Sequence, residues 1–144
     1  MRVELRTAAF APWRELAASP DGGLEPGSYG ATCAFVGTMR DFNEGDTVER
    51  MVLEHYPGMT ERQLEAIVEQ ECSAHGLLAA RVVHRIGAIE PGESIVLVAT
   101  WSAHRRAAYA GGRAIMEALK SRAPFWKREE TGAGSRWVER NTAG

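Results

Sequence analysis

The sequence contains few of the features that would tie it to a membrane, a disulfide framework or a metal. It has 144 residues, and its longest strongly apolar run, residues 95–99, is far shorter than the roughly 20 residues of a membrane-spanning helix. Cys33 and Cys72 stand alone, without a CxxC pair or a histidine at zinc-ligand spacing. The N-terminus lacks the apolar core of a secretory signal. We therefore expect a cytoplasmic protein with two reduced thiols and no bound metal.

Lysine is also scarce, because 15 of the 17 basic residues are arginine and the only lysines are Lys120 and Lys127. The net charge of -2 is too small for a general binder of nucleic acid or of a membrane surface. This charge is unevenly distributed. Residues 104–128 carry seven basic side chains and one acidic side chain, a net charge of +6, and the rest of the chain carries -8. The sequence thus predicts one basic site for an anion on an otherwise acidic protein.

The hydrophobic patterns predict a single α+β domain over residues 1–144. Strands are expected at 29–37, 48–55, 80–86 and 94–101, with extended segments at 125–130 and 136–139. Helices are expected from Thr60 to Gly76, with Gln63 completing a capping box, and from about 103 to 122, with Ser102 as N-cap. The result is a mostly antiparallel sheet covered by two main helices, similar to an α/β hammerhead. We expect the 48–55 strand to pair with the 29–37 strand.

A stretch rich in proline and glycine, residues 19–27, predicts a loop. It divides the chain into an N-terminal segment with its loop, residues 1–28, and a main body, residues 29–140.

The start of the second helix is unusually basic. His104, Arg105 and Arg106 occupy its first turn, where the helix dipole disfavours cations. One interpretation is a solvated basic surface, and the other is that His104, Arg105 and free backbone N–H groups bind an anion such as a phosphate. For His104 and Arg105 together we favour the anion site. Because a helix rises about 1.5 Å per residue, Arg105 and Lys120 are about 22 Å apart. They serve different sites, or one site that is shared across a symmetric dimer.

The remaining candidates differ in strength. Lys120 and Lys127 can lose a proton near neutrality when other cations crowd them, which arginine cannot, although two lysines could also be an accident of composition. His55 and His84 lie in predicted strands, where a hydrogen-bonded position at the core edge is the simpler interpretation. Cys33 lies in mid-strand without a neighbouring base, which indicates inert packing.

Several long blocks carry a resemblance to a known family. They are FVGTMR (35–40), LEHYPGMT (53–60), HRIG (84–87), SAHR (102–105) and LKSRAPFWKRE (119–129). In this order and spacing they closely resemble the large, catalytic subunit of molybdopterin synthase, the MoaE family, from about residue 29 to residue 140.

The resemblance implies a sulfurtransferase of molybdenum cofactor biosynthesis. Such an enzyme converts cyclic pyranopterin monophosphate to molybdopterin by inserting two dithiolene sulfurs. The sulfur comes from the Gly-Gly thiocarboxylate that ends a small ubiquitin-like partner, so no cofactor is expected. Large subunits form a homodimer, and each binds one small subunit to give a heterotetramer.

The resemblance also implies residue roles. Lys120 and Lys127 are the expected catalytic residues. The expected substrate contacts are Thr38, Met39, Arg40, His104, Arg105, Lys120, Lys127, Arg128 and Glu129. Of these, His104 and Arg105 would come from the neighbouring large subunit, and Phe35 and Met116 would line the pocket for the partner's tail.

Three alternatives stay open at this point. The chain could be a phosphate- or pterin-binding module without catalysis, or a phosphoester hydrolase that acts through His104. Arg128 and Glu129 could form a local ion pair instead of binding substrate.

Overall fold

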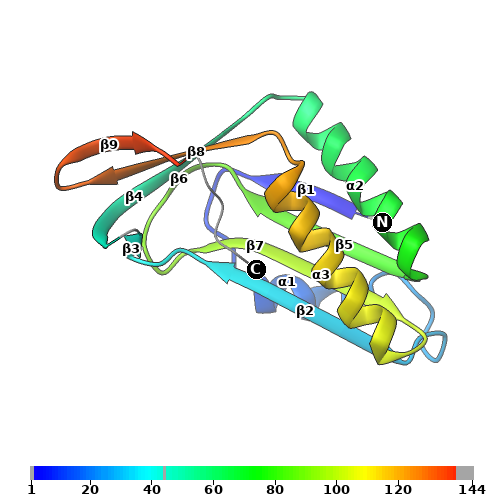
Figure 1. Cartoon of the computed structure of the whole chain (residues 1–144). Coiled ribbons are helices and arrows are strands. Elements are labelled where there is room, and N and C mark those ends of the chain that lie inside the picture. Colours follow the sequence, from blue (N-terminus) through cyan, green and yellow to red (C-terminus); the bar gives the residue numbers. More distant parts are fainter. Residues whose placement is uncertain (1, 44, 139–144) are drawn as a thin grey trace.

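Two β-sheets meet at one end of a helical layer in this computed structural model, which describes residues 2–43 and 45–138 (Figure 1). The first sheet has the order β1-β5-β7-β2. Its strands are β1 (Arg2–Arg6), β5 (Ala79–Arg85), β7 (Ser94–Ser102) and β2 (Ala31–Thr38). β1 and β5 run parallel, and the other neighbours run antiparallel. β2 therefore forms one edge of this sheet and β1 the other.

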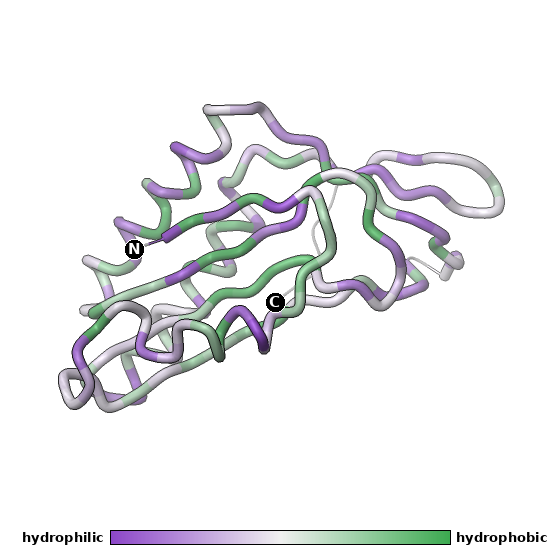
Figure 2. Tube along the Cα trace, turned by 180° about the vertical axis from the view of Figure 1, so that it is seen from behind, coloured by the Kyte–Doolittle hydropathy of each residue, from purple (hydrophilic) through white to green (hydrophobic). Residues whose placement is uncertain are grey.

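Helices cover both faces of the first sheet. α2 (Met59–His75) and α3 (Arg105–Ser121) lie side by side on one face, and the short α1 (Pro12–Ala18) lies on the other (Figure 1). Every residue of β5 is buried as a result. Ala80 and Val82 pack with residues of α2 and α3, whereas Ala79 and Val83 pack on the opposite side with Trp101. Hydrophobic residues are accordingly concentrated in the middle strands of this sheet (Figure 2).

The second sheet projects beyond the helical layer and is built around β4 (Asp46–His55). Its order is β3 (Phe42–Asn43), β4, β8 (Phe125–Thr131) and β9 (Gly134–Trp137), and β6 (Gly87–Ile89) also pairs with β4. Met51, Leu53 and Ile89 form its small apolar core with Met39 and Val48. Because β8 follows α3 after a short turn, this sheet comes to lie next to the C-terminal end of that helix.

The predicted architecture is confirmed in its main features: an α+β fold with two main helices and mostly antiparallel strands. The expected pairing of the 48–55 strand with the 29–37 strand is wrong. β4 pairs with β8 and β6, and β2 pairs with β7. Alternation along a strand fixes which side chains share a face, but it does not specify the partner strand.

The N-terminal segment contributes more than the predicted loop. β1 extends the first sheet, and Phe10 and Leu16 pack under it against the cluster that contains Trp101. The indole Nε1 of Trp101 donates a hydrogen bond to the carbonyl oxygen of Pro20 at 2.9 Å. Residues 2–28 are thus part of the folded body, although the sequence patterns assigned no element to them.

Both predicted helix starts need correction. Gly58 is the N-cap of α2, and its N–H donates to the carboxylate of Glu61, so the predicted box of Thr60 and Gln63 is wrong. Thr60 is buried instead and its Oγ1 accepts a hydrogen bond from the N–H of Tyr56. α3 begins at Arg105, and its N-cap is His104.

Ser102 does not cap α3, because its hydroxyl donates to the carbonyl oxygen of His104 at 2.5 Å. The predicted stop of the first main helix is confirmed, since Gly76 adopts a left-handed conformation with φ of 66°. Residues 139 and 140, at the end of the predicted extended segment and of the predicted body, lie outside the described residues.

Candidate active site

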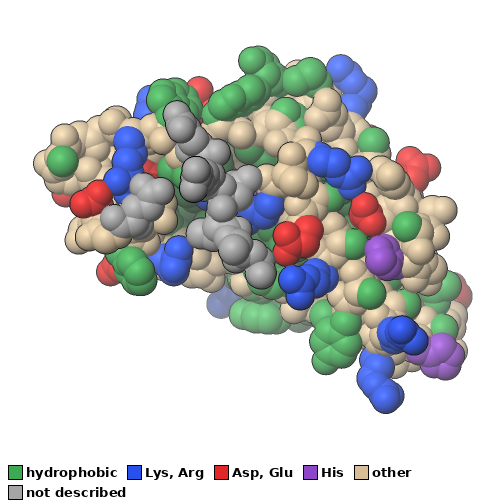
Figure 3. Space-filling view, viewed as in Figure 1, with side chains coloured by type: hydrophobic (Ala, Val, Ile, Leu, Met, Phe, Trp, Pro, Cys, Tyr) green, Lys and Arg blue, Asp and Glu red, His purple; other side chains and the backbone are tan. Residues whose placement is uncertain are grey.

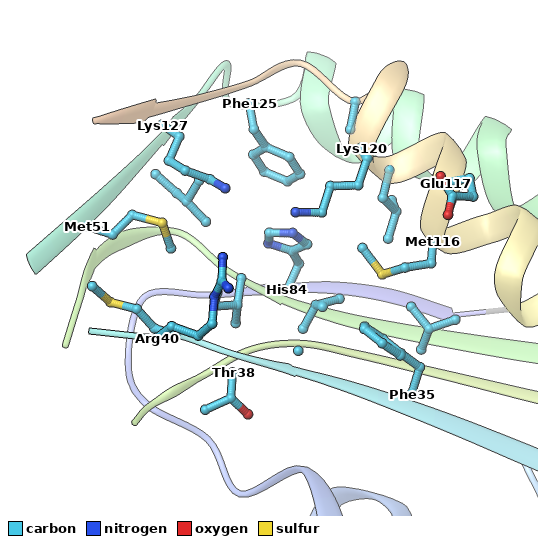
Figure 4. Close-up of a pocket in the computed structure, with 18 of the residues that line it drawn as sticks. Phe35, Thr38, Arg40, Met51, His84, Met116, Glu117, Lys120, Phe125 and Lys127 are labelled. Carbon is cyan, nitrogen blue, oxygen red and sulfur yellow. The ribbon is translucent and has the colours of Figure 1, made fainter. Parts of the chain in front are cut away.

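A cavity of about 1050 Å³ lies where the two sheets and the end of α3 meet (Figure 4). Its lining comes from both sheets and from α3. It includes eight of the predicted site residues: Phe35, Thr38, Met39, Arg40, Met116, Lys120, Lys127 and Glu129. These residues span 95 positions of the sequence, so only the fold brings them together.

The two lysines approach the cavity from different elements. Lys120 lies in the last turn of α3, and Lys127 lies in β8 (Figure 4). Burial is the main cause that lowers the pKa of Lys120, and the charge of Arg40 lowers it further. Burial also lowers the pKa of Lys127, followed by the charge of Lys120. Both amines are therefore easier to deprotonate than an exposed lysine, and both are cations that an incoming anion would stabilise.

Arg40 completes a basic end of the cavity. It lies two residues after the end of β2, and Figure 4 shows its side chain pointing toward the same space as those of Lys120 and Lys127. Its guanidinium lies 5.1 Å from the ring centre of Phe42. The chain is held here by Met39, whose N–H donates to the carbonyl oxygen of Glu93 at 2.9 Å. Three cations thus converge in one partly enclosed space, an arrangement suited to a phosphate or carboxylate.

The other part of the cavity is apolar. Phe35 and Met116 line it, together with the exposed ring of Tyr109 and the small residue Gly112. Phe35 keeps 46% of its surface exposed although it is a large apolar side chain. Cys33 also lines the cavity. From its position in mid-strand, the sequence predicted inert packing and not a place at a cavity. The cavity therefore has a basic end and an apolar part lined by Phe35, Tyr109, Gly112 and Met116, which we call the apolar approach.

Glu129 is a buried carboxylate in the lining, and its partners differ from the ion pair considered from the sequence. Its oxygens accept hydrogen bonds from Asn43 Nδ2 at 3.0 and 3.1 Å and from Arg136 Nε at 3.3 Å. Arg128 instead lies 3.9 Å from Glu54 and 5.9 Å from the ring centre of Trp137. Glu129 thus ties β8 to β3 and β9 around the cavity.

Three predicted substrate contacts do not line the cavity. Arg128 lies outside its lining, and His104 and Arg105 are exposed at the opposite end of α3 from Lys120. Lys and Arg side chains are spread over the face that carries α3 (Figure 3). Within one chain, His104 and Arg105 therefore cannot reach the same small molecule as Lys120.

His84 lines the cavity, although the sequence suggested only a hydrogen-bonded place at the core edge. It is buried, and its ring stacks on Phe125 with 4.3 Å between the centroids and 18° between the planes. Burial is the main cause that lowers the pKa of His84, to about 4, and the charges of Lys120 and Lys127 add to it. In the sequence, the one feature that could have indicated a place for His84 in the site is its position in the HRIG block (84–87).

Over residues 2–43 and 45–138, no three His, Cys, Asp or Glu side chains are grouped to hold a metal ion. In the same residues, no helix is long and apolar enough to cross a membrane. Cys33 and Cys72 are free thiols.

The fold and the cavity define an α+β protein whose cavity, beside two half-buried lysines, is suited to an anion. Comparisons with known proteins place it more closely. A family model described as MoaE protein matches residues 9–122. Over 139 residues, the chain is 48% identical to a Pseudomonas aeruginosa protein named molybdopterin synthase catalytic subunit, and the match covers 96% of this chain and 91% of that protein. The chain belongs to the MoaE family.

Solved structures agree with this assignment. The molybdopterin biosynthesis MoaE protein from Burkholderia ambifaria superposes with a TM-score of 0.80 at 40% identity, covering 99% of this chain and 92% of that chain. A Helicobacter pylori structure is described as a complex of subunits 1 and 2 of molybdopterin-converting factor. It shares the fold with a TM-score of 0.77 at 19% identity, covering 97% of this chain and 92% of that chain.

Proposed function

We propose that this protein is the catalytic subunit of a molybdopterin synthase. It converts cyclic pyranopterin monophosphate to molybdopterin with two sulfurs from the C-terminal thiocarboxylate of a small ubiquitin-like partner. The observation that carries the proposal is the cavity itself, in which Lys120, Lys127 and Arg40 surround a basic end that opens into an apolar approach. The reaction that we assign to this cavity is inferred from membership in the MoaE family.

The charges of the cavity match the charges of the two reactants. The substrate brings a phosphate and the partner's tail brings a thiocarboxylate, so both are stabilised by a cluster of cations in a partly buried site. Lys127 and Arg40 hold the pterin or its phosphate. Lys120 stabilises the thiocarboxylate and the oxyanion that develops at its carbonyl carbon.

Lys120 also has the properties of a proton carrier, because burial and Arg40 lower the pKa of its amine. In each transfer, the partner's thiocarboxylate sulfur bonds to a side-chain carbon of the pterin substrate, and a carbon–oxygen bond breaks at that carbon: one transfer opens the cyclic phosphate, and the other releases a hydroxyl as water. Water then cleaves the bond between the sulfur and the partner's carbonyl carbon, which ends as a carboxylate. The nucleophilic sulfur therefore comes from the partner. No cysteine of this chain, Cys33 included, and no cofactor is needed for the reaction.

The apolar approach suits the partner's tail. A Gly-Gly segment is narrow and extended, so it can pass between Phe35, Met116 and the backbone at Gly112 and deliver its terminal group to Lys120. The description of the Helicobacter pylori structure as a complex of two subunits supports a partner of this kind.

A homodimer of large subunits completes the site. His104 and Arg105 of one subunit would approach the cavity of the other, since within a chain α3 keeps them about 22 Å from Lys120. Two large and two small subunits then form a heterotetramer. Both thiols are free, which fits a reducing compartment, and we place the reaction in the cytoplasm.

One assay tests this function against its two alternatives. The protein is incubated with cyclic pyranopterin monophosphate, with and without thiocarboxylated partner, and molybdopterin is measured. Product that forms only with the thiocarboxylated partner supports the proposal. Substrate binding without product would indicate a binding module, and turnover without the partner would indicate a phosphoester hydrolase.

A further inference from the structure

His84 occupies a place where the fold would otherwise put an apolar side chain. Along β5, Ala80 and Val82 pack under α2 and α3, and His84 is the next residue of the same row. A polar ring in such a row costs free energy unless its nitrogen atoms are hydrogen-bonded. The row ends at the cavity, so the imidazole is buried in the fold and still borders the basic end.

The contacts of the ring fix its tautomer. Nδ1 lies 2.7 Å from the carbonyl oxygen of Arg85, which can only accept, so Nδ1 carries the hydrogen. Burial and the neighbouring cations lower the pKa of His84 to about 4, and the ring is therefore neutral at physiological pH. A neutral imidazole with its hydrogen on Nδ1 leaves Nε2 as a hydrogen-bond acceptor.

The orientation of the ring is fixed as well. Phe125 stacks on it nearly in parallel, at 4.3 Å between centroids. Figure 4 shows the ring beside the end of Lys120, which descends from α3, with Lys127 and Arg40 approaching from β8 and from the chain after β2. Of the two lysines, Lys120 has the larger electrostatic effect on His84.

We propose that His84 is a positioning residue for Lys120, whose ammonium group donates a hydrogen bond to Nε2 of His84. The proposal rests on the function proposed above for Lys120. A neutral acceptor can orient an ammonium group and leave its positive charge available to the substrate, whereas a carboxylate would cancel that charge. The fixed tautomer and the stacked ring keep this acceptor in one place while reactants enter and leave.

Two substitutions separate the roles of the two ring nitrogens. In His84→Asn, the amide nitrogen can take the place of Nδ1 and donate to Arg85, but the acceptor at Nε2 is lost. In His84→Gln, the longer side chain can place its amide oxygen where Nε2 was. A purely structural role through Arg85 predicts that Asn is the better replacement, and the proposed role predicts that Gln is.

The chain contains only two lysines, so NMR of protein with labelled lysine shows two side-chain amines, assigned with Lys120→Arg and Lys127→Arg. Loss of an acceptor destabilises the ammonium form. We therefore expect the acid dissociation constant of Lys120 to increase about tenfold in His84→Asn and to stay near the wild-type value in His84→Gln. An unchanged titration of Lys120 in His84→Asn would overturn the proposal, as would equal changes at Lys120 and Lys127.

A second measurement does not depend on the folding of the His84 variants. In protein with labelled histidine, the Nε2 resonance of His84 is expected to move in Lys120→Met and to change much less in Lys127→Met. No movement in Lys120→Met would contradict the hydrogen bond. Neither titration nor chemical shift needs sulfur transfer, so both decide the contact even if the proposed reaction fails.

Kinetics then connect the contact to the reaction. Single-turnover transfer by His84→Asn should be slowed about tenfold, with the substrate concentration for half-saturation within about twofold of wild type. His84→Gln should transfer at a rate close to that of wild type. A role through Lys120 would be contradicted if His84→Asn changed only the substrate concentration for half-saturation and not the transfer rate. Equal decreases of the transfer rate in His84→Asn and His84→Gln would contradict it as well.

Discussion

Lys120 and Lys127 reach one cavity from two different layers of the fold, Lys120 from the last turn of α3 and Lys127 from β8. The charge of Lys120 is the second cause, after burial, that lowers the pKa of Lys127. Among the residues that the structure describes, Glu117 raises the pKa of Lys120 and Glu129 raises that of Lys127, each by less than burial lowers it. The basic end of the cavity is therefore poised for an anion, and its charge depends on pH.

The first prediction concerns anion binding at alkaline pH. Because the pKa of each lysine is lowered in the folded protein, the cations are lost as pH rises through values below the ordinary lysine value of about 10.4. Affinity for inorganic phosphate should thus decrease with rising pH in the wild type. In a Lys120→Arg, Lys127→Arg variant it should persist to higher pH, since guanidinium stays charged. Calorimetric titration checks this, and identical pH dependence in both proteins would contradict it.

The second prediction concerns stability at acid pH. The pKa of His84 is lowered to about 4 in the folded protein and is about 6.5 in the unfolded chain, so the unfolded state binds more protons between these values. The free energy of unfolding should therefore decrease as pH falls from about 6.5 to 4, by about 3 kcal/mol in total. Urea denaturation at a series of pH values measures this decrease.

His84→Gln is the matched control for the acid prediction, because glutamine does not titrate in this range. Its stability should fall less between pH 6.5 and 4 than that of the wild type. Parallel decreases in the two proteins would show that His84 is not the group responsible.

Sequence patterns were sufficient for the two main helices and for most strands. They also singled out Lys120 and Lys127, which the structure places in one cavity. They were insufficient for strand pairing, because β4 and β8 alternate in a way that does not specify which neighbour each takes. They also did not predict that His84 lines the cavity. The sequence of an apolar strand with one histidine is the same whether that histidine faces solvent or a cavity. The convergence of Arg40, Lys120 and Lys127 depends on contacts between distant segments, which local spacing does not contain.

The third prediction concerns the N-terminal loop. A Cβ at Gly22 would lie 2.6 Å from the ring of Trp101, which is fully buried and cannot move away. Gly22→Ala should lower the free energy of unfolding by about 1–3 kcal/mol more than Gly23→Ala. Gly23 is the matched control, because it also has a positive φ but has no heavy atom within 4 Å of the added Cβ. Equal thermal stability of the two variants would show that the loop does not pack as described.

The fourth prediction concerns the shared site. Arg105→Ala and Lys120→Ala should each be inactive alone. If each cavity takes Arg105 from the other subunit, a mixed dimer of these variants has one cavity with both residues intact. Random exchange of subunits should then restore about a quarter of wild-type sulfur transfer. No recovery after exchange, verified by mass spectrometry of the mixed dimers, would place both residues at the same cavity of one chain.

Lys120 is the residue on which the proposed reaction depends most directly. The decisive measurement is single-turnover formation of molybdopterin from the cyclic pterin and thiocarboxylated partner by Lys120→Ala. Arg122→Ala serves as control, because Arg122 is an exposed cation just beyond the same helix end that pairs with Glu71. We expect Lys120→Ala to remain dimeric and to lose transfer by about a hundredfold or more, and Arg122→Ala to remain active. Near-normal product formation by Lys120→Ala would contradict the assignment of Lys120 as the catalytic residue.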